Sequence, residues 1–211
     1  MSVADYQKHA DQKLLFKAAG SNDFQTIADI MARGHADINA QNKNGRTPLI
    51  VALENKHSEA ALMLIHHKAD ITAVLPPANY PPLAIACAKG MTEVIERLVT
   101  VGAPLDVQVP LDGETALMKA IRRGDGWAVC RLVAAGADTD TITNHNGKTA
   151  WHMAHEHLET KDYTFFKSLV EKQRGLRLQK TAHELAENVR DATVLQREIK
   201  PLKRLHLRPR G

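Results

Sequence analysis

The sequence predicts an all-α solenoid, a stack of helix pairs with one further helix at its C-terminal end. Three observations predict it: residue types recur at one constant spacing, as from Ala18 through Ala52 to Ala154, each period carries two helix signals, and aromatic residues make up only 4% of the chain. A core with few large aromatics is typical of thin layers of small residues between stacked helices.

The 34-residue period runs through four registers, of which two extend over all five repeats and two over four residues each. Alanine fills the first and leucine the second, with Trp151 in the fifth repeat; glycine fills the other two, with Asn79 and Lys68 as the exceptions. The registers are Ala18, Ala52, Ala86, Ala120 and Ala154; Leu15, Leu49, Leu83, Leu117 and Trp151; Gly45, Asn79, Gly113 and Gly147; and Gly34, Lys68, Gly102 and Gly136.

The second repeat shows the local signals most clearly. Asn44–Gly45 is a turn signal, Thr47 is an N-cap residue, and Pro48 fits the first helical position, where its missing N–H costs nothing. A second amphipathic helix follows, and in other repeats it stops at a glycine such as Gly102 or Gly136. Neither helix buries its apolar stripe alone, so the repeats must stack.

These motifs resemble the ankyrin repeat. The residues that carry the resemblance are Gly45–Leu49, Gly113–Leu117 and Gly147–His152. It implies an L-shaped stack of helix pairs with projecting hairpin fingers, and a non-enzymatic module that binds another protein. Five repeats are predicted within a domain of residues 1–172: 12–41, 42–75, 76–109, 110–143 and 144–172.

In that family, residues at the fingers and at the ends of the inner helices bind partners on the concave face. The third finger, Leu75–Pro82, contains four prolines and is expected to be stiff. A solvated face is the alternative interpretation of these residues. The predicted partner-binding residues are Arg46, Glu54, Asn55, Tyr80, Lys89, Glu114, Arg122, Arg123, Lys148 and His157.

The C-terminal segment differs in charge. Residues 173–211 hold 10 Lys and Arg against 4 Asp and Glu, a net +6, whereas residues 1–172 carry a net −2. Thr181–Glu184 reads as a capping box, which predicts a helix within 173–200 that covers the last repeat, followed by a basic tail, 201–211. The tail could solubilise, dock a protein, or touch anionic lipid or nucleic acid. Its candidate contacts are Lys200, Lys203, Arg204, Arg208 and Arg210.

Other chemistry is sparse. His152 and His155 are three residues apart, but no third metal ligand follows at useful spacing, and His152 falls in a slot where the family resemblance implies a structural hydrogen bond. Cys87 and Cys130 read as small core residues. No cofactor, catalytic residue or metal site is predicted, and an enzyme or metal protein built on these histidines is the weaker alternative.

We therefore expect a non-enzymatic protein-protein interaction module, such as an adaptor, an inhibitor or an immunity-type partner. The alternative is a secreted bacterial effector, or a module that acts through the basic tail on a membrane or a nucleic acid. With no apolar stretch near the first residues, no long apolar run and only two cysteines, the sequence predicts a cytoplasmic protein, monomeric when alone.

Overall fold

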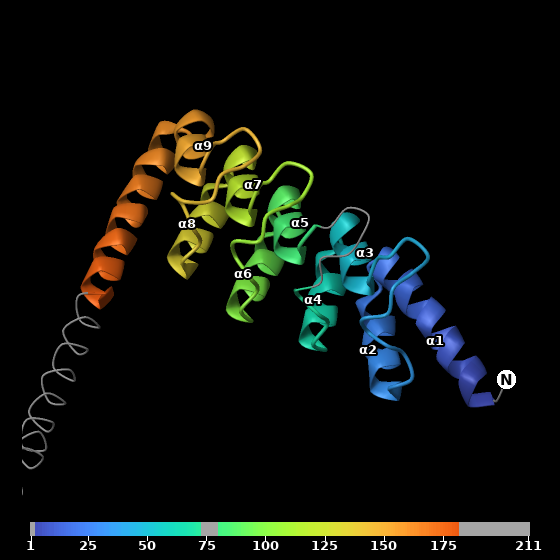
Figure 1. Ribbon diagram of the computed structural model, residues 1–211. Coiled ribbons are helices and arrows are strands. Elements are labelled where there is room, and N and C mark those ends of the chain that lie inside the picture. Colours follow the sequence, from blue (N-terminus) through green and yellow to red (C-terminus); the bar gives the residue numbers. More distant parts are fainter. Residues whose placement is uncertain (1–2, 73–79, 182–211) are drawn as a thin grey trace, which may run out of the picture. The chain divides into compact units, whose positions relative to one another are not determined.

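The computed structural model describes residues 3–72 and 80–181, so residues 1–2, 73–79 and 182–211, which include most of the third finger, lie outside the described part. The chain comprises two compact units, Met1–Leu169 and Val170–Gly211. The first unit holds helices α1 to α9 (Figure 1). Among the described residues, no helix is both long enough and apolar enough to cross a bilayer.

The helices form two layers within the first unit (Figure 1). The inner helices pack on one another in chain order, as do the outer helices, and each inner helix packs on the outer helix of its own repeat where both are named. From the second repeat on, the inner helices are α3 (Pro48–Glu54), α5 (Pro82–Lys89), α7 (Ala116–Arg123) and α9 (Ala150–His157). The first repeat and the outer layer supply α1 (Val3–Gly20), α2 (Phe24–Arg33), α4 (Ser58–His66), α6 (Thr92–Thr100) and α8 (Gly126–Ala135).

The helix starts repeat at the predicted period in both layers, as Pro48, Pro82, Ala116 and Ala150 show for the inner one. Thr47, Thr115 and Thr149 cap the inner helices, because each side-chain oxygen accepts a hydrogen bond from the backbone N–H three residues later. The third repeat has no such cap: Pro81 stands at the N-cap position and Pro82 follows it in the first turn. The predicted caps of the Thr-containing repeats are therefore confirmed.

The helix ends depend on left-handed residues. Gly34, Gly102 and Gly136 have positive φ, and Lys68 takes the same conformation at φ 63° in the remaining slot of that register. A second left-handed register ends the first helix of each of the first four repeats, with Lys56 at φ 61°. The second repeat thus holds two lysines where a residue without Cβ is favoured.

The core lies between the layers and between repeats. Leu15, Leu49 and Leu117 are fully buried and Leu83 is 1% exposed, which confirms the predicted register. The alanine register is buried as well, and its small side chains allow neighbouring helices to approach closely. In the fifth repeat Trp151 replaces leucine and packs against Phe166, with ring centroids 5.6 Å apart.

The fifth repeat ends in a long helix. Residues 160–181 are helical, and this helix starts on the 34-residue period of the outer layer. The loop before it is therefore not lengthened, and the helix itself is longer than the other outer helices. The predicted capping box at Thr181 is wrong: Thr181 lies inside the helix, and its hydroxyl donates to the carbonyl of Arg177 at 2.9 Å. The rest of the predicted C-terminal helix and the basic tail lie outside the described residues.

Candidate partner-binding surface

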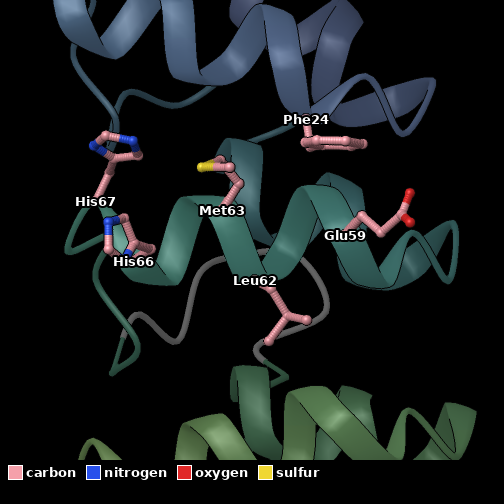
Figure 2. Close-up of a pocket in the computed structure, with 6 residues that line it drawn as sticks. All are labelled: Phe24, Glu59, Leu62, Met63, His66 and His67. Carbon is pink, nitrogen blue, oxygen red and sulfur yellow. The ribbon is translucent and has the colours of Figure 1, made fainter.

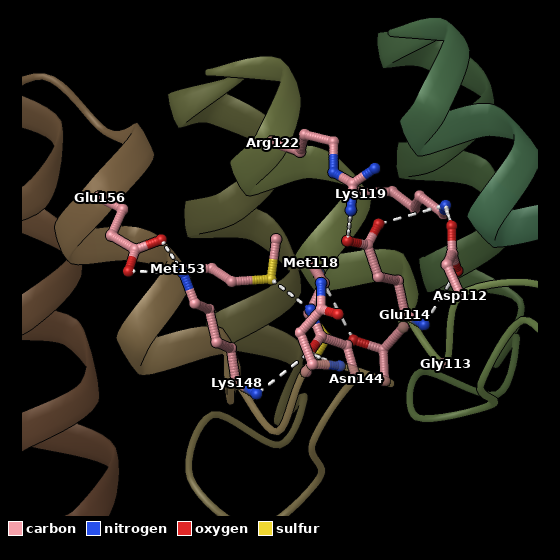
Figure 3. A network of polar contacts seen from close by, with 12 residues as sticks. Asp112, Gly113, Glu114, Met118, Lys119, Arg122, Asn144, Lys148, Met153 and Glu156 are labelled. Atoms are coloured by element: carbon pink, nitrogen blue, oxygen red, sulfur yellow. Dashed lines mark hydrogen bonds and ion pairs between the residues drawn. The ribbon is translucent and has the colours of Figure 1, made fainter.

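The inner face is the surface formed by the ends of the inner helices and by the residues just before each helix. Several repeats carry an ion pair there between residues eight positions apart. Arg46 pairs with Glu54 at 3.1 Å in the second repeat, and Lys148 pairs with Glu156 at 2.6 Å in the fifth. The fourth repeat uses the same two slots with the charges exchanged, Glu114 and Arg122 (Figure 3).

The third repeat breaks this row. Tyr80 and Ala88 occupy the two slots, so no ion pair forms between them. Tyr80 is half-buried and Ala88 is exposed. The ammonium of Lys119, from the neighbouring repeat, lies 5.6 Å from the centroid of the Tyr80 ring, within cation–π range. The inner face therefore changes from paired charges to an aromatic side chain at this repeat.

The fourth repeat holds a charged cluster (Figure 3), which includes the Lys119 that lies over the Tyr80 ring. The side chain of Glu114 is fully buried, and one of its oxygens accepts a hydrogen bond from Arg122. Its other oxygen lies 3.2 Å from Nζ of Lys119 in an ion pair, and Lys119 also pairs with Asp112. A carboxylate so far from water requires cations beside it. The sequence places Glu114 among the partner contacts; this is wrong, because a partner cannot reach the buried carboxylate.

The remaining predicted contacts fall into two groups. Arg46, Glu54, Arg122 and Lys148 belong to the ion pairs described above, the last of them with Glu156. Hydrogen bonding by Lys148 lowers the pKa of Glu156 below its ordinary value, so this pair keeps its charges at neutral pH. Exposed residues at or next to the helix ends form the second group, one per repeat at equivalent positions: Asn55, Lys89, Arg123 and His157. The predicted tail contacts lie outside the described residues.

Lys119 is the residue that sequence reasoning missed. It lies inside α7 with a side chain only 9% exposed, at a register position that holds Val51, Ile85 and Met153 in the second, third and fifth repeats and Lys17 in the first. A lysine in an apolar slot was a usable signal, because a buried ammonium requires an acidic partner. The structure supplies two such partners, Asp112 and Glu114.

The fifth-repeat histidines have structural contacts. His152 Nδ1 lies 2.7 Å from the hydroxyl of Thr149 and 3.4 Å from its backbone nitrogen, which completes a capping box. His155 packs edge-on against Tyr163 at 5.3 Å. Within 3–72 and 80–181, no three His, Cys, Asp or Glu side chains gather as a metal site would require. Burial raises the pKa of the Cys87 thiol, as expected of a core cysteine.

A shallow groove of about 490 Å³ lies between α2 and α4, on the outer layer (Figure 2). Phe24, the first residue of α2, is 40% exposed there and faces α4 across the groove. Phe24 is the exposed apolar side chain of this groove, and Leu62 and Met63 are partly buried beside it. The lining residues are Phe24, Glu59, Leu62, Met63, His66 and His67.

Known proteins share these repeats. The chain is 33% identical over 122 residues to the B-cell lymphoma 3 protein homolog of Mus musculus, covering 58% of this chain and 27% of that protein. It is 28% identical over 131 residues to Rabankyrin-5 of Mus musculus, covering 62% and 11%. It is 25% identical over 154 residues to the E3 ubiquitin-protein ligase KEG of Arabidopsis thaliana, covering 72% and 9%. The chain thus spans 27% or less of the length of each of these relatives.

The comparison with protein families covers most of the chain. Residues 3–74 and 83–182 match the family described as ankyrin repeats (3 copies). These are the segments that carry the repeat period and the paired helices of Figure 1. Ankyrin repeats indicate a module for protein–protein interaction, and the family is generally not enzymatic. The chain belongs to the ankyrin-repeat family.

Proposed function

We propose that this protein is a non-enzymatic adaptor or inhibitor that docks a partner protein on its inner face, at the third and fourth repeats. The observation that carries the proposal is the break in the row of ion pairs at Tyr80. The paired residues on either side already satisfy one another's charge, so they gain little from a partner. Tyr80 offers instead a large, partly exposed aromatic surface, the kind of side chain that dominates binding energy at interfaces.

The fourth-repeat cluster supports this location. Lys119 contacts the Tyr80 ring and forms ion pairs with Asp112 and Glu114. Its position is therefore fixed, and it restricts the motion of the Tyr80 ring. A side chain that is ordered before binding loses less conformational entropy when a partner covers it. Tyr80 therefore serves as the anchor of the proposed interface, and the surrounding ion pairs form its polar rim.

The test compares two tyrosine variants of the full chain. Tyr80→Ala removes the proposed anchor, and Tyr6→Ala removes a tyrosine that is 71% exposed on α1, outside the inner face of the third and fourth repeats. Affinity capture with quantitative mass spectrometry identifies the bound proteins, and calorimetry then measures each affinity. We expect Tyr80→Ala to weaken binding by more than about 1 kcal/mol and Tyr6→Ala to leave it unchanged.

Two results would contradict the proposal. A partner that binds both variants like the wild type does not use the inner face at Tyr80. A partner that is lost only when residues 201–211 are deleted binds the basic tail, which would favour the alternative function of that segment.

A further inference from the structure

Two cations at the ends of inner helices lack the acidic partner that their neighbours have within the described part of the chain. Lys89 and Arg123 are the last residues of α5 and α7, at equivalent positions of adjacent repeats, and both are exposed. Neither forms an ion pair with another described residue, whereas Arg122, adjacent to Arg123, is bonded to Glu114. At the end of α7, Arg122 is thus neutralised by Glu114, whereas Arg123 at the next position, like Lys89 at the end of α5, is not neutralised by a described residue.

Gly90 places the Arg123 guanidinium against the end of α5 that carries Lys89. It follows Lys89 directly and ends α5 in the left-handed conformation, with φ 65°. A Cβ at this position would overlap the guanidinium of Arg123. The Arg123 side chain therefore turns back from its own repeat and lies against the backbone next to Lys89. The glycine permits this close approach as well as the positive φ.

The surroundings leave the pair uncompensated. Asp125, two residues beyond Arg123, is engaged as the N-cap of α8, where it accepts the N–H of Ala128 at 3.0 Å. The C-terminal end of α5 favours a nearby cation, but this interaction is screened by solvent at an exposed helix end. An anion bound at this helix end is attracted by both positive charges, because neither is paired with a described acidic side chain.

We infer that Lys89 and Arg123 form a cationic clamp for a carboxylate on an acidic segment of the partner protein; this inference rests on the proposed function. The guanidinium offers a planar, two-pronged set of donors that matches a carboxylate, and the ammonium adds a second charge from the adjacent repeat. An acidic protein segment fits better than a nucleic acid, because the flanking charges are already paired, Arg46 with Glu54 and Lys148 with Glu156. The clamp therefore offers two positive charges rather than the long basic track that a continuous polyanion requires.

The experiment is a residue-resolved NMR titration of the ¹⁵N-labelled full chain with a ten-residue glutamate peptide. We expect saturable shifts of the Lys89, Gly90 and Gly124 amides. Lys89→Gln/Arg123→Gln should raise the dissociation constant obtained from these signals at least fivefold. The charge-matched control is Arg97→Gln/Lys161→Gln, two exposed cations outside the inner face, and it should leave that constant unchanged.

Residue resolution separates the clamp from the basic tail, which also attracts the peptide. The inference is overturned if the three amides do not respond, if both double variants behave alike, or if a ten-nucleotide DNA strand binds these residues more tightly than the peptide. A partner that depends on Tyr80 but not on Lys89 and Arg123 refutes the clamp and leaves the proposed function standing. If the peptide binds at Lys89 and Arg123 but partner proteins bind Tyr80→Ala as tightly as the wild type, the proposed docking site is refuted instead.

Discussion

Replacing Lys119 by methionine tests whether the buried cluster stabilises the fourth repeat. The fifth repeat has Met153 in the same register position, so on sequence pattern alone Lys119→Met restores an apolar slot and should stabilise the fold. The structure predicts the opposite, because the carboxylate of Glu114 is fully buried and loses the ammonium 3.2 Å from its oxygen.

The magnitude follows from what remains around Glu114. Breaking a buried ion pair by removing one partner costs about 3–5 kcal/mol. Arg122 stays bonded to the carboxylate, but its side chain is 52% exposed, so water screens its charge. We therefore expect the free energy of unfolding to fall by about 3 kcal/mol, the lower end of that range.

Urea denaturation followed by circular dichroism measures this change, with the double variant Glu114→Gln/Lys119→Met as the matched control. The double variant removes the buried charge of Glu114 together with its partner Lys119. We expect its free energy of unfolding to lie within about 1 kcal/mol of that of the wild type. A single variant as stable as the wild type, or a double variant no better than the single one, would refute the reasoning.

Three further predictions concern the fold. Leu117→Ala should lower the free energy of unfolding by about 2–5 kcal/mol in urea denaturation, because Leu117 is fully buried, whereas Leu111→Ala, at a side chain 73% exposed, should change little. Lys68→Gly should raise the unfolding free energy by about 1 kcal/mol, because Lys68 is left-handed at φ 63°; an unchanged urea midpoint would contradict this. Hydrogen bonding by Arg33 lowers the pKa of Asp11, so ionised Asp11 stabilises the fold above its unfolded pKa of about 4 and this contribution is lost as the pH falls through the lower folded value. The advantage of the wild type over Asp11→Asn in urea midpoint should therefore be present at pH 7 and vanish near pH 2; a constant difference would contradict the assignment.

The sequence by itself determined the repeat. Helix starts and ends depend on residues within a few positions of one another, such as Thr47 with the N–H of Ile50, and these signals act locally wherever the segment lies. Burial of Leu117 followed in the same way, because an apolar stripe that recurs in every repeat must face the next repeat. The local rule failed at Thr181, which reads as a cap and is itself helical.

Only the tertiary structure decided which charges are free. Both Glu114 and Arg122 occupy slots that the repeat pattern places at the surface, yet packing of the fourth repeat buries the carboxylate and engages the arginine. Arg123, one residue further, instead turns toward Gly90 in the preceding repeat. A long charged side chain can reach several partners at similar distances. Which partner it binds depends on the distances between repeats, and no local sequence signal encodes those distances. The repeat could thus be derived residue by residue, whereas the binding surface required the packed neighbours.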